Sequence, residues 1–161
     1  MKKLTIALAF LLTFSLPVMA QDFQKGQAAF NAGDYAAALK EWTPLAEAGD
    51  AYTQHALGLG YLSGTGVPQD YAEAVKWLRL AAEQGHARAQ FNLGNIHEKG
   101  QGVLQDNAIA HMWYNISAAN GWGFSGTLRD VLTEEMTPAA IEKAQAMARE
   151  CMSSGYKKCG Y

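Results

Sequence analysis

The chain has 161 residues, of which 49% are hydrophobic and 17% charged, and its formal net charge at pH 7 is −2. This length fits one ordinary domain. The slightly acidic balance argues against a nucleic-acid partner, because such a partner requires a basic surface stripe.

The N-terminal segment has the three parts of a secretory signal peptide. Two lysines precede an apolar run over residues 4–16, and the segment ends at a small residue, Ala20. A transmembrane anchor is the alternative, but it needs about 20 apolar residues. We therefore predict a signal peptide over 1–20 that is cleaved after Ala20. The mature protein is then periplasmic or secreted and does not insert into a membrane.

Residues 22–30 and 35–48 form the first predicted pair of helices. Asp34 is the expected N-cap of the second helix. Apolar residues recur on that helix at nearly helical spacing, at Ala36, Leu39, Trp42 and Leu45. The pair makes a first unit of about 21–49.

The next two segments, 50–85 and 86–121, are copies of each other. They coincide at fourteen positions when they are offset by 36 residues. The shared positions are Ala51/Ala87, Gln54/Gln90, Leu57/Leu93, Gly58/Gly94, Gly64/Gly100, Gly66/Gly102, Val67/Val103, Gln69/Gln105, Asp70/Asp106, Ala72/Ala108, Ala74/Ala110, Trp77/Trp113, Ala82/Ala118 and Gly85/Gly121. A fixed period of this size indicates a repeat array.

Each copy is predicted to be two helices joined by a glycine-rich loop. In the first copy a helix over 51–62 is followed by a second helix that Asp70 caps, and Glu73 is placed to complete a capping box. Gly58 and Gly94 lie inside helices, where glycine costs about 1 kcal/mol relative to alanine. We expect two helices to cross closely at these glycines. The repeat-fixed tryptophans are expected to fill the core.

The period ends at Gly121, and residues 122–161 are predicted to cap the array. One helix is expected within 122–136. Thr137 and Pro138 then have the residue types of an N-cap and a first helical position, and they open a helix to about Met152. A repeat array needs an atypical end unit to cover its last apolar face.

Two cysteines, Cys151 and Cys159, lie in this end segment. In an exported chain such a pair is more often a disulfide than a metal or redox site. We predict that the bridge fixes the tail to the last helix. A bridge to another chain is the alternative.

These motifs resemble the Sel1-like repeat. The resemblance rests on Ala87-x-x-Gln90-x-x-Leu93-Gly94, Gly100-x-Gly102-Val103-x-Gln105-Asp106, Ala110-x-x-Trp113 and Ala118-x-x-Gly121, and on their earlier copy. The first unit is more similar to a tetratricopeptide repeat. The resemblance implies an all-α fold, a right-handed α-α superhelix (solenoid) of about three helix-turn-helix repeats with a C-terminal capping segment.

The resemblance also implies that the protein binds other proteins and is not an enzyme. Bacterial members often act as adaptors, regulators or assembly factors in the periplasm or outside the cell. Some cysteine-rich members are associated with β-lactam binding and slow hydrolysis, but units two and three of this chain have no cysteine. A weak hydrolase of β-lactam or cell-wall substrates and a structural subunit of an envelope complex remain alternative functions.

One face of the first helices is expected to line the concave groove of the solenoid. It carries aromatic and arginine side chains, which are common interface anchors. The predicted binding residues are Tyr52, His55, Leu59, Leu62, Arg88, Phe91, Asn95 and Glu98. The alternative is an ordinary surface, or a face that a neighbouring segment buries.

Other motifs do not indicate a catalytic or cofactor site. Residues 154–157 match S-x-x-K but lack the S-D-N and K-T-G partners. Residues 121–126 match G-x-G-x-x-G without the preceding strand that a dinucleotide site requires. The four histidines have no metal-ligand spacing. We therefore predict no catalytic residues, no cofactor and no metal.

Overall fold

A computed structural model describes the backbone of residues 15–159 and the side chains of residues 22–159. This part of the chain contains eight α-helices and no strand. The helices are α1 (Ser15–Asn31), α2 (Tyr35–Glu47), α3 (Ala51–Ser63), α4 (Tyr71–Ala82), α5 (Ala87–Lys99), α6 (Asn107–Ala119), α7 (Phe124–Glu134) and α8 (Pro138–Ser153).

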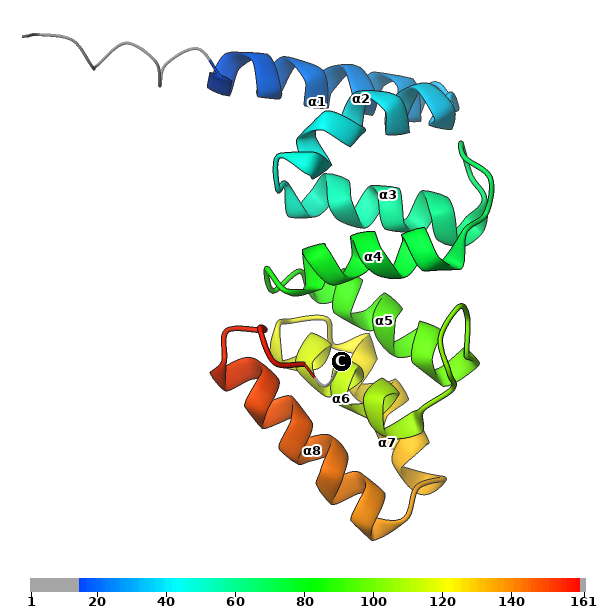
Figure 1. The fold of residues 1–161 in the computed structure, drawn as a ribbon, viewed down its shortest axis with the longest axis vertical. Helices are drawn as coiled ribbons and strands as arrows, with labels where there is room; N and C mark the ends of the chain where they lie inside the picture. The colour runs from blue at the N-terminus through cyan, green and yellow to red at the C-terminus, as the bar shows by residue number, and fades with distance from the viewer. Residues whose placement is uncertain (1–14, 160–161) are drawn as a thin grey trace, which may run out of the picture.

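The helices stack in chain order, as a repeat array requires. Each helix from α1 to α6 packs against the next one, and α6 also contacts both α7 and α8. Figure 1 shows α1 and α2 at one end of the elongated molecule and α7 and α8 at the other. The predicted all-α solenoid is confirmed.

Short side chains begin most of the helices by accepting hydrogen bonds from the first turn. Asp34, Asp50, Asp70 and Asp106 do so, and Thr137 begins α8 with Pro138 in its first turn. The predicted capping box at Asp70 is only half formed. Asp70 accepts from the amide of Glu73 at 3.1 Å. The Glu73 carboxylate instead pairs with Lys76 at 3.0 Å, because the amide of Asp70 already donates to the carbonyl of Tyr61.

The glycine-rich loop of each copy reaches back to the preceding unit. A Cβ at Gly66 would lie 2.7 Å from the carbonyl carbon of Tyr35, and one at Gly102 would lie 2.5 Å from the Cβ of Tyr71. Both glycines also have positive φ, 80° and 71°. Only glycine combines this backbone conformation with such close approach. The loop therefore contributes to the stacking of consecutive units.

The core runs along the array as three clusters of buried side chains. Leu39, Trp42, Leu57 and Trp77 join the first unit to the second, and Leu78, Leu93 and Trp113 join the second to the third. Ala110, Tyr114 and Leu132 join α6 to α7. The repeat-fixed Trp77 and Trp113 are buried, as predicted, and so is Trp42 of the first unit.

A ladder of buried amides crosses the unit boundaries. Gln54 donates to the carbonyl of Ala46 at 2.9 Å and accepts from Gln84 at 2.8 Å. One repeat later, Gln90 donates to the carbonyl of Ala82 at 3.0 Å and accepts from Asn120 at 2.8 Å. Because a buried polar group without a partner is costly, these bonds favour one relative orientation of consecutive units.

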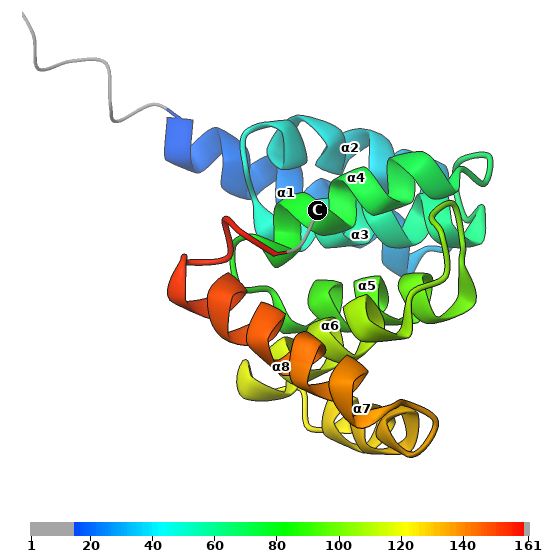
Figure 2. The same ribbon diagram turned by 60° about the horizontal axis from the view of Figure 1, so that its bottom comes forward.

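The C-terminal tail folds back along the array instead of extending from it. Cys151 on α8 is bonded to Cys159, with a Cα–Cα distance of 4.4 Å. Tyr156, between them, donates to Asn120 at 2.9 Å and lies against Gly85. Both cysteines belong to the same core cluster as Leu78 of α4. Figure 2 shows the tail curling back from the end of α8 toward α4.

Residues 1–14 of the predicted signal peptide lie outside the described residues, so the structure does not test it. Helix α1 already begins at Ser15, whereas the sequence predicted a helix from residue 22. Pro17 does not prevent this start because proline is tolerated in the first turn of a helix. Among the described residues, no helix is long and apolar enough to cross a membrane.

Candidate functional site

Two adjoining hollows lie on the first helices of the units. One is lined from α1, α2 and α3, and the other from α3, the start of α5 and the turn before α7. Both are lined by His55. With the aromatic side chains beside them they form a surface that we call the groove face: Phe30, Tyr35, Tyr52, His55, Leu59, Arg88, Phe91, Trp122 and Phe124.

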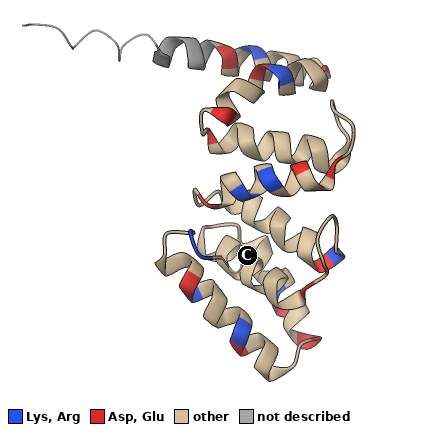
Figure 3. Ribbon diagram, viewed as in Figure 1, with Lys and Arg blue, Asp and Glu red and all other residues tan. Residues whose placement is uncertain are grey.

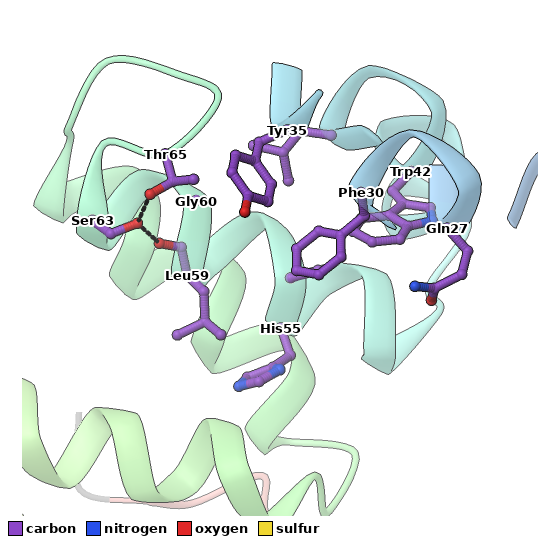
Figure 4. Close-up of a pocket in the computed structure, with 11 residues that line it drawn as sticks. Gln27, Phe30, Tyr35, Trp42, His55, Leu59, Gly60, Ser63 and Thr65 are labelled. Atoms are coloured by element: carbon purple, nitrogen blue, oxygen red, sulfur yellow. Dashed lines mark hydrogen bonds between the residues drawn. The ribbon is translucent and has the colours of Figure 1, made fainter. Parts of the chain in front are cut away.

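The first hollow has a volume of about 480 Å³ and a mainly apolar lining. Its walls include Phe30, Tyr35 and Leu59, with Trp42 between α1 and α3 (Figure 4). The rings of Phe30 and Tyr35 meet edge to face at 5.2 Å. Such packed rings give a rigid apolar recess with large contact area.

One end of this hollow is polar. Ser63 donates to the carbonyl of Leu59 at 2.8 Å, and its hydroxyl lies 2.8 Å from that of Thr65. These hydroxyls stand at the C-terminal end of α3 and the start of the following loop. An occupant with an apolar group and a nearby polar group would match both parts of the hollow.

The second hollow, of about 530 Å³, has a more polar lining, which includes the positively charged side chain of Arg88. The guanidinium of Arg88 lies 4.6 Å from the ring centroid of Trp122, a distance at which cation–π attraction operates. Tyr52, which is 71% exposed, meets the ring of His86 edge to face at 5.1 Å. The hollow is therefore lined by an arginine that packs on Trp122, together with the rings of Tyr52 and His86.

His55 joins the two hollows and is neutral at pH 7. Burial lowers its pKa to about 4, helped by the positive charges of His86 and Arg88. Nδ2 of Asn92 lies 3.1 Å from Nε2 of His55, within hydrogen-bond distance. The two histidine rings are 4.6 Å apart. Burial also lowers the pKa of His86, whose Nδ1 accepts from the amide of Ala89 and caps α5.

The groove face continues past Arg88 as an aromatic cluster. Phe91 lies 6.3 Å from Trp122 and 5.9 Å from Phe124, measured between ring centroids. Phe124 is more than half exposed. These rings extend the contact surface from α5 to α7.

The structure brings together five of the eight predicted binding residues and separates three. Tyr52, His55, Leu59, Arg88 and Phe91 belong to the groove face. Leu62 instead packs against the core cluster of the second and third units.

Asn95 and Glu98 have an internal role. The hydroxyl of Tyr114 donates to the carboxylate of Glu98 and lies 2.9 Å from Oδ1 of Asn95, which can share the same proton. Burial raises the pKa of that hydroxyl above its ordinary value, and the bond to Glu98 raises it further. The two side chains therefore fix a buried ring and are not placed in either hollow.

Sequence reasoning missed the groove-face residues of the first unit and those at and just before the start of α7. Phe30 and Tyr35 lie in a unit that matches the 36-residue period only in part. Trp122 and Phe124 lie beyond the last repeat. The structure leaves Phe30, Tyr35 and Phe124 exposed. The signal that could have indicated them is a large aromatic residue outside the predicted core stripe.

Ser154, the first residue of the S-x-x-K match, is the C-cap of α8. Ser154 donates to the carbonyl of Cys151 at 2.8 Å and accepts from the amide of Lys158 at 3.0 Å. Among the described residues, no three His, Cys, Asp or Glu side chains gather where a metal ion could bind.

A family model for the Sel1 repeat matches this chain twice, at residues 51–86 and 87–122. These limits are shifted by one residue from the units inferred from the sequence. A search of curated protein sequences gave no significant match.

Two solved structures resemble the chain over most of its length. One, described as a protective antigen present in uropathogenic Escherichia coli strains displaying an SLR fold, is 26% identical over 86% of this chain with a TM-score of 0.78. This chain covers only 31% of that protein. The other, a Sel1 repeat protein from Oxalobacter formigenes, is 26% identical over 90% of this chain and 70% of its own, with a TM-score of 0.69.

Sel1 repeats commonly mediate protein–protein interactions. The family match covers both copies of the 36-residue period, and the structural match extends beyond them to most of the chain. The chain thus carries two Sel1 repeats within a solenoid of the kind that Sel1-repeat proteins adopt.

Proposed function

We propose that the chain is an exported, non-catalytic interaction module whose groove face holds a segment of another protein. The observation that carries the proposal is the meeting of an apolar and a cationic hollow at His55. Specific interfaces are anchored by a few side chains that fill such recesses. The groove face offers recesses of two kinds side by side.

The lining defines the chemistry of the partner segment. The first hollow suits a large apolar or aromatic side chain, since its walls are rings and leucines. Arg88 in the second hollow suits a carboxylate, which a guanidinium binds with two parallel hydrogen bonds. Helix α3, which contributes to both hollows, carries no charged residue. We therefore expect a segment with an apolar anchor followed by an acidic residue.

The proposal of export rests on the N-terminal sequence pattern. The basic start, the short apolar run and the small residue Ala20 before Gln21 are those of a cleaved leader. N-terminal sequencing of the protein purified from the cell envelope or medium should give Gln21 as the first residue. A mature protein that still begins at residue 1 would contradict the proposal.

Site-specific photocrosslinking in living cells tests the groove face. A photoreactive residue is placed at Leu59 of α3 and, as a matched control, at Leu80 of α4. The two leucines have nearly the same exposure, 38% and 39%. Leu59 lines the first hollow, whereas Leu80 is outside both hollows of the groove face. We expect a discrete crosslinked protein from position 59 and none from position 80.

The captured partner, once purified, is then titrated with the wild type, Leu59→Glu and Leu80→Glu. Only Leu59→Glu should weaken binding, by about tenfold or more, as for loss of an anchor residue. Thermal unfolding of both variants separates lost binding from lost folding. Equal effects of the two substitutions, or the same crosslinks from both positions, would refute the groove-face assignment.

A further inference from the structure

A third hollow, of about 330 Å³, lies at the C-terminal end of the array, away from the groove face. It is lined by side chains of α6, α7 and α8. Figures 1 and 2 show these three helices grouped at one end of the molecule. Unlike the first hollow, it has a polar lining with two arginines.

A buried histidine without a partner forms part of this hollow. His111 on α6 is only 2% exposed, and its Nδ1 makes no hydrogen bond to the described residues. Burial lowers its pKa, and the charge of Arg129 lowers it further, while Asp130 opposes the shift. The ring is therefore neutral at pH 7 and can donate one N–H. A buried polar atom left unpaired in this way is costly unless a ligand or water satisfies it.

The arginine on α7 is held in place but still has donors to spare. Arg129 donates from Nε and Nη2 to Asp130, at 2.9 and 2.7 Å, and from Nη1 to Asn115 at 3.0 Å. A guanidinium has five N–H groups, so these bonds leave a second N–H on each terminal nitrogen. Asp130 balances the charge of Arg129.

The arginine on α8 is not balanced. Arg149 lines the same hollow and makes no ion pair within the part of the chain that the structure describes. Counting Arg129, Asp130 and Arg149, the hollow has one uncompensated positive charge beside a neutral imidazole. This is the donor set for an oxyanion, since arginine binds carboxylate and phosphate oxygens in a fork.

We propose that the hollow between α6, α7 and α8 binds a small oxyanion, a carboxylate or phosphate group, through Arg149 and the remaining N–H groups of Arg129, with His111 at its wall. The site is separate from the groove face and does not depend on the proposed function. Inorganic phosphate and succinate are the probes for the two chemical sources. Each is titrated into the full mature chain by calorimetry at low ionic strength.

Two single-charge variants of α8 make the test specific. Arg149→Gln removes the unbalanced guanidinium and should weaken binding about tenfold or more. Lys143→Gln removes the same charge from an exposed position of the same helix that does not line the hollow. It should leave the affinity within about twofold of the wild type, since Lys143 does not line the hollow and would act on the anion only through water, where the interaction of separated charges is weak. The ring signal of His111 in NMR spectra should shift on binding.

The outcomes are distinct. Saturable binding of phosphate, of succinate or of both, lost in Arg149→Gln and kept in Lys143→Gln, supports the site and identifies the preferred group. No saturation by either probe at about 10 mM, a concentration that detects even a millimolar Kd, would overturn it. Equal weakening by both substitutions, or a shift confined to the other histidines, would also overturn it.

Discussion

Substituting Gly94 by alanine tests the close crossing of α5 and α6. A Cβ at Gly94 would lie 2.5 Å from Tyr114 Cε1 and 2.6 Å from its Cδ1. Carbon atoms in contact are normally about 3.5–4.0 Å apart. The Tyr114 ring cannot move aside easily, because it is fully buried and its hydroxyl is held by Asn95 and Glu98.

Two opposing terms set the size of the effect. Alanine gains about 1 kcal/mol over glycine within a helix. Overpacking a tight core costs typically 1–3 kcal/mol. Because the Tyr114 ring is fixed, we expect a cost at the upper end, about 3 kcal/mol. The unfolding free energy should therefore fall by about 2 kcal/mol. For a chain of this size the Tm should fall by roughly 4–8 °C.

Gly126→Ala is the matched control for this substitution. Gly126 lies in α7, and an added Cβ would meet only the Cβ of Ala118, at 3.8 Å, which is ordinary contact. The helix term then acts alone, and stability should rise by up to about 1 kcal/mol. Circular dichroism during heating and urea titration measures both variants. If Gly94→Ala were as stable as Gly126→Ala, the close-crossing argument would be wrong.

Three further predictions concern acid, the disulfide and the amide ladder. Burial lowers the pKa of His55 to about 4, so the contribution of the neutral ring to stability is complete above pH 6.5. The free energy of unfolding should fall by roughly 1–2 kcal/mol by pH 5. Urea unfolding of His55→Gln should show a smaller fall over the same pH range, and an equal fall would count against this cause. Thiol labelling of unreduced protein should find neither Cys151 nor Cys159 free, and replacing both by alanine should cost roughly 2–3 kcal/mol; two reactive thiols would disprove the bridge. Gln90→Leu removes one of the two donors to the carbonyl of Ala82, which keeps the amide of Gly85, and it leaves the side-chain amide of Asn120 without its acceptor. It should cost about 1–3 kcal/mol, so a wild-type urea midpoint would exclude that role for the ladder.

The array was predictable from sequence because its determinants are local and repeated. Gly58 and Gly94 indicated the helix crossings, and added Cβ atoms there would lie 2.6 Å from Leu78 and 2.5 Å from Tyr114. Asp70 indicated a helix start, and the structure places α4 directly after it. Such signals depend on residues within one unit, so a single sequence reveals them.

The sites were less predictable because they depend on how units are placed against one another. Asn95 is on the same helix as Arg88 and Phe91, but its side chain contacts the Tyr114 hydroxyl on α6, and the spacing of residues along the chain does not reveal this contact. The anion hollow joins His111, Arg129 and Arg149 from three helices without any common spacing. Among the described residues, Figure 3 shows Lys and Arg interspersed with Asp and Glu along the ribbon, so the order of charges in the chain did not indicate the hollow.

The return of the tail to the middle of the array affects how the molecule comes apart. Stacked hairpins ordinarily fray from whichever end is weaker, one unit at a time. Here Tyr156 touches the turns that close two successive copies, at Gly85 and Asn120. Because the disulfide joins α8 to the tail, α8 cannot separate from the array while Tyr156 stays packed on these two turns. Amide exchange near the C-terminus should be as slow as at the centre of the solenoid, and reducing conditions should restore fraying.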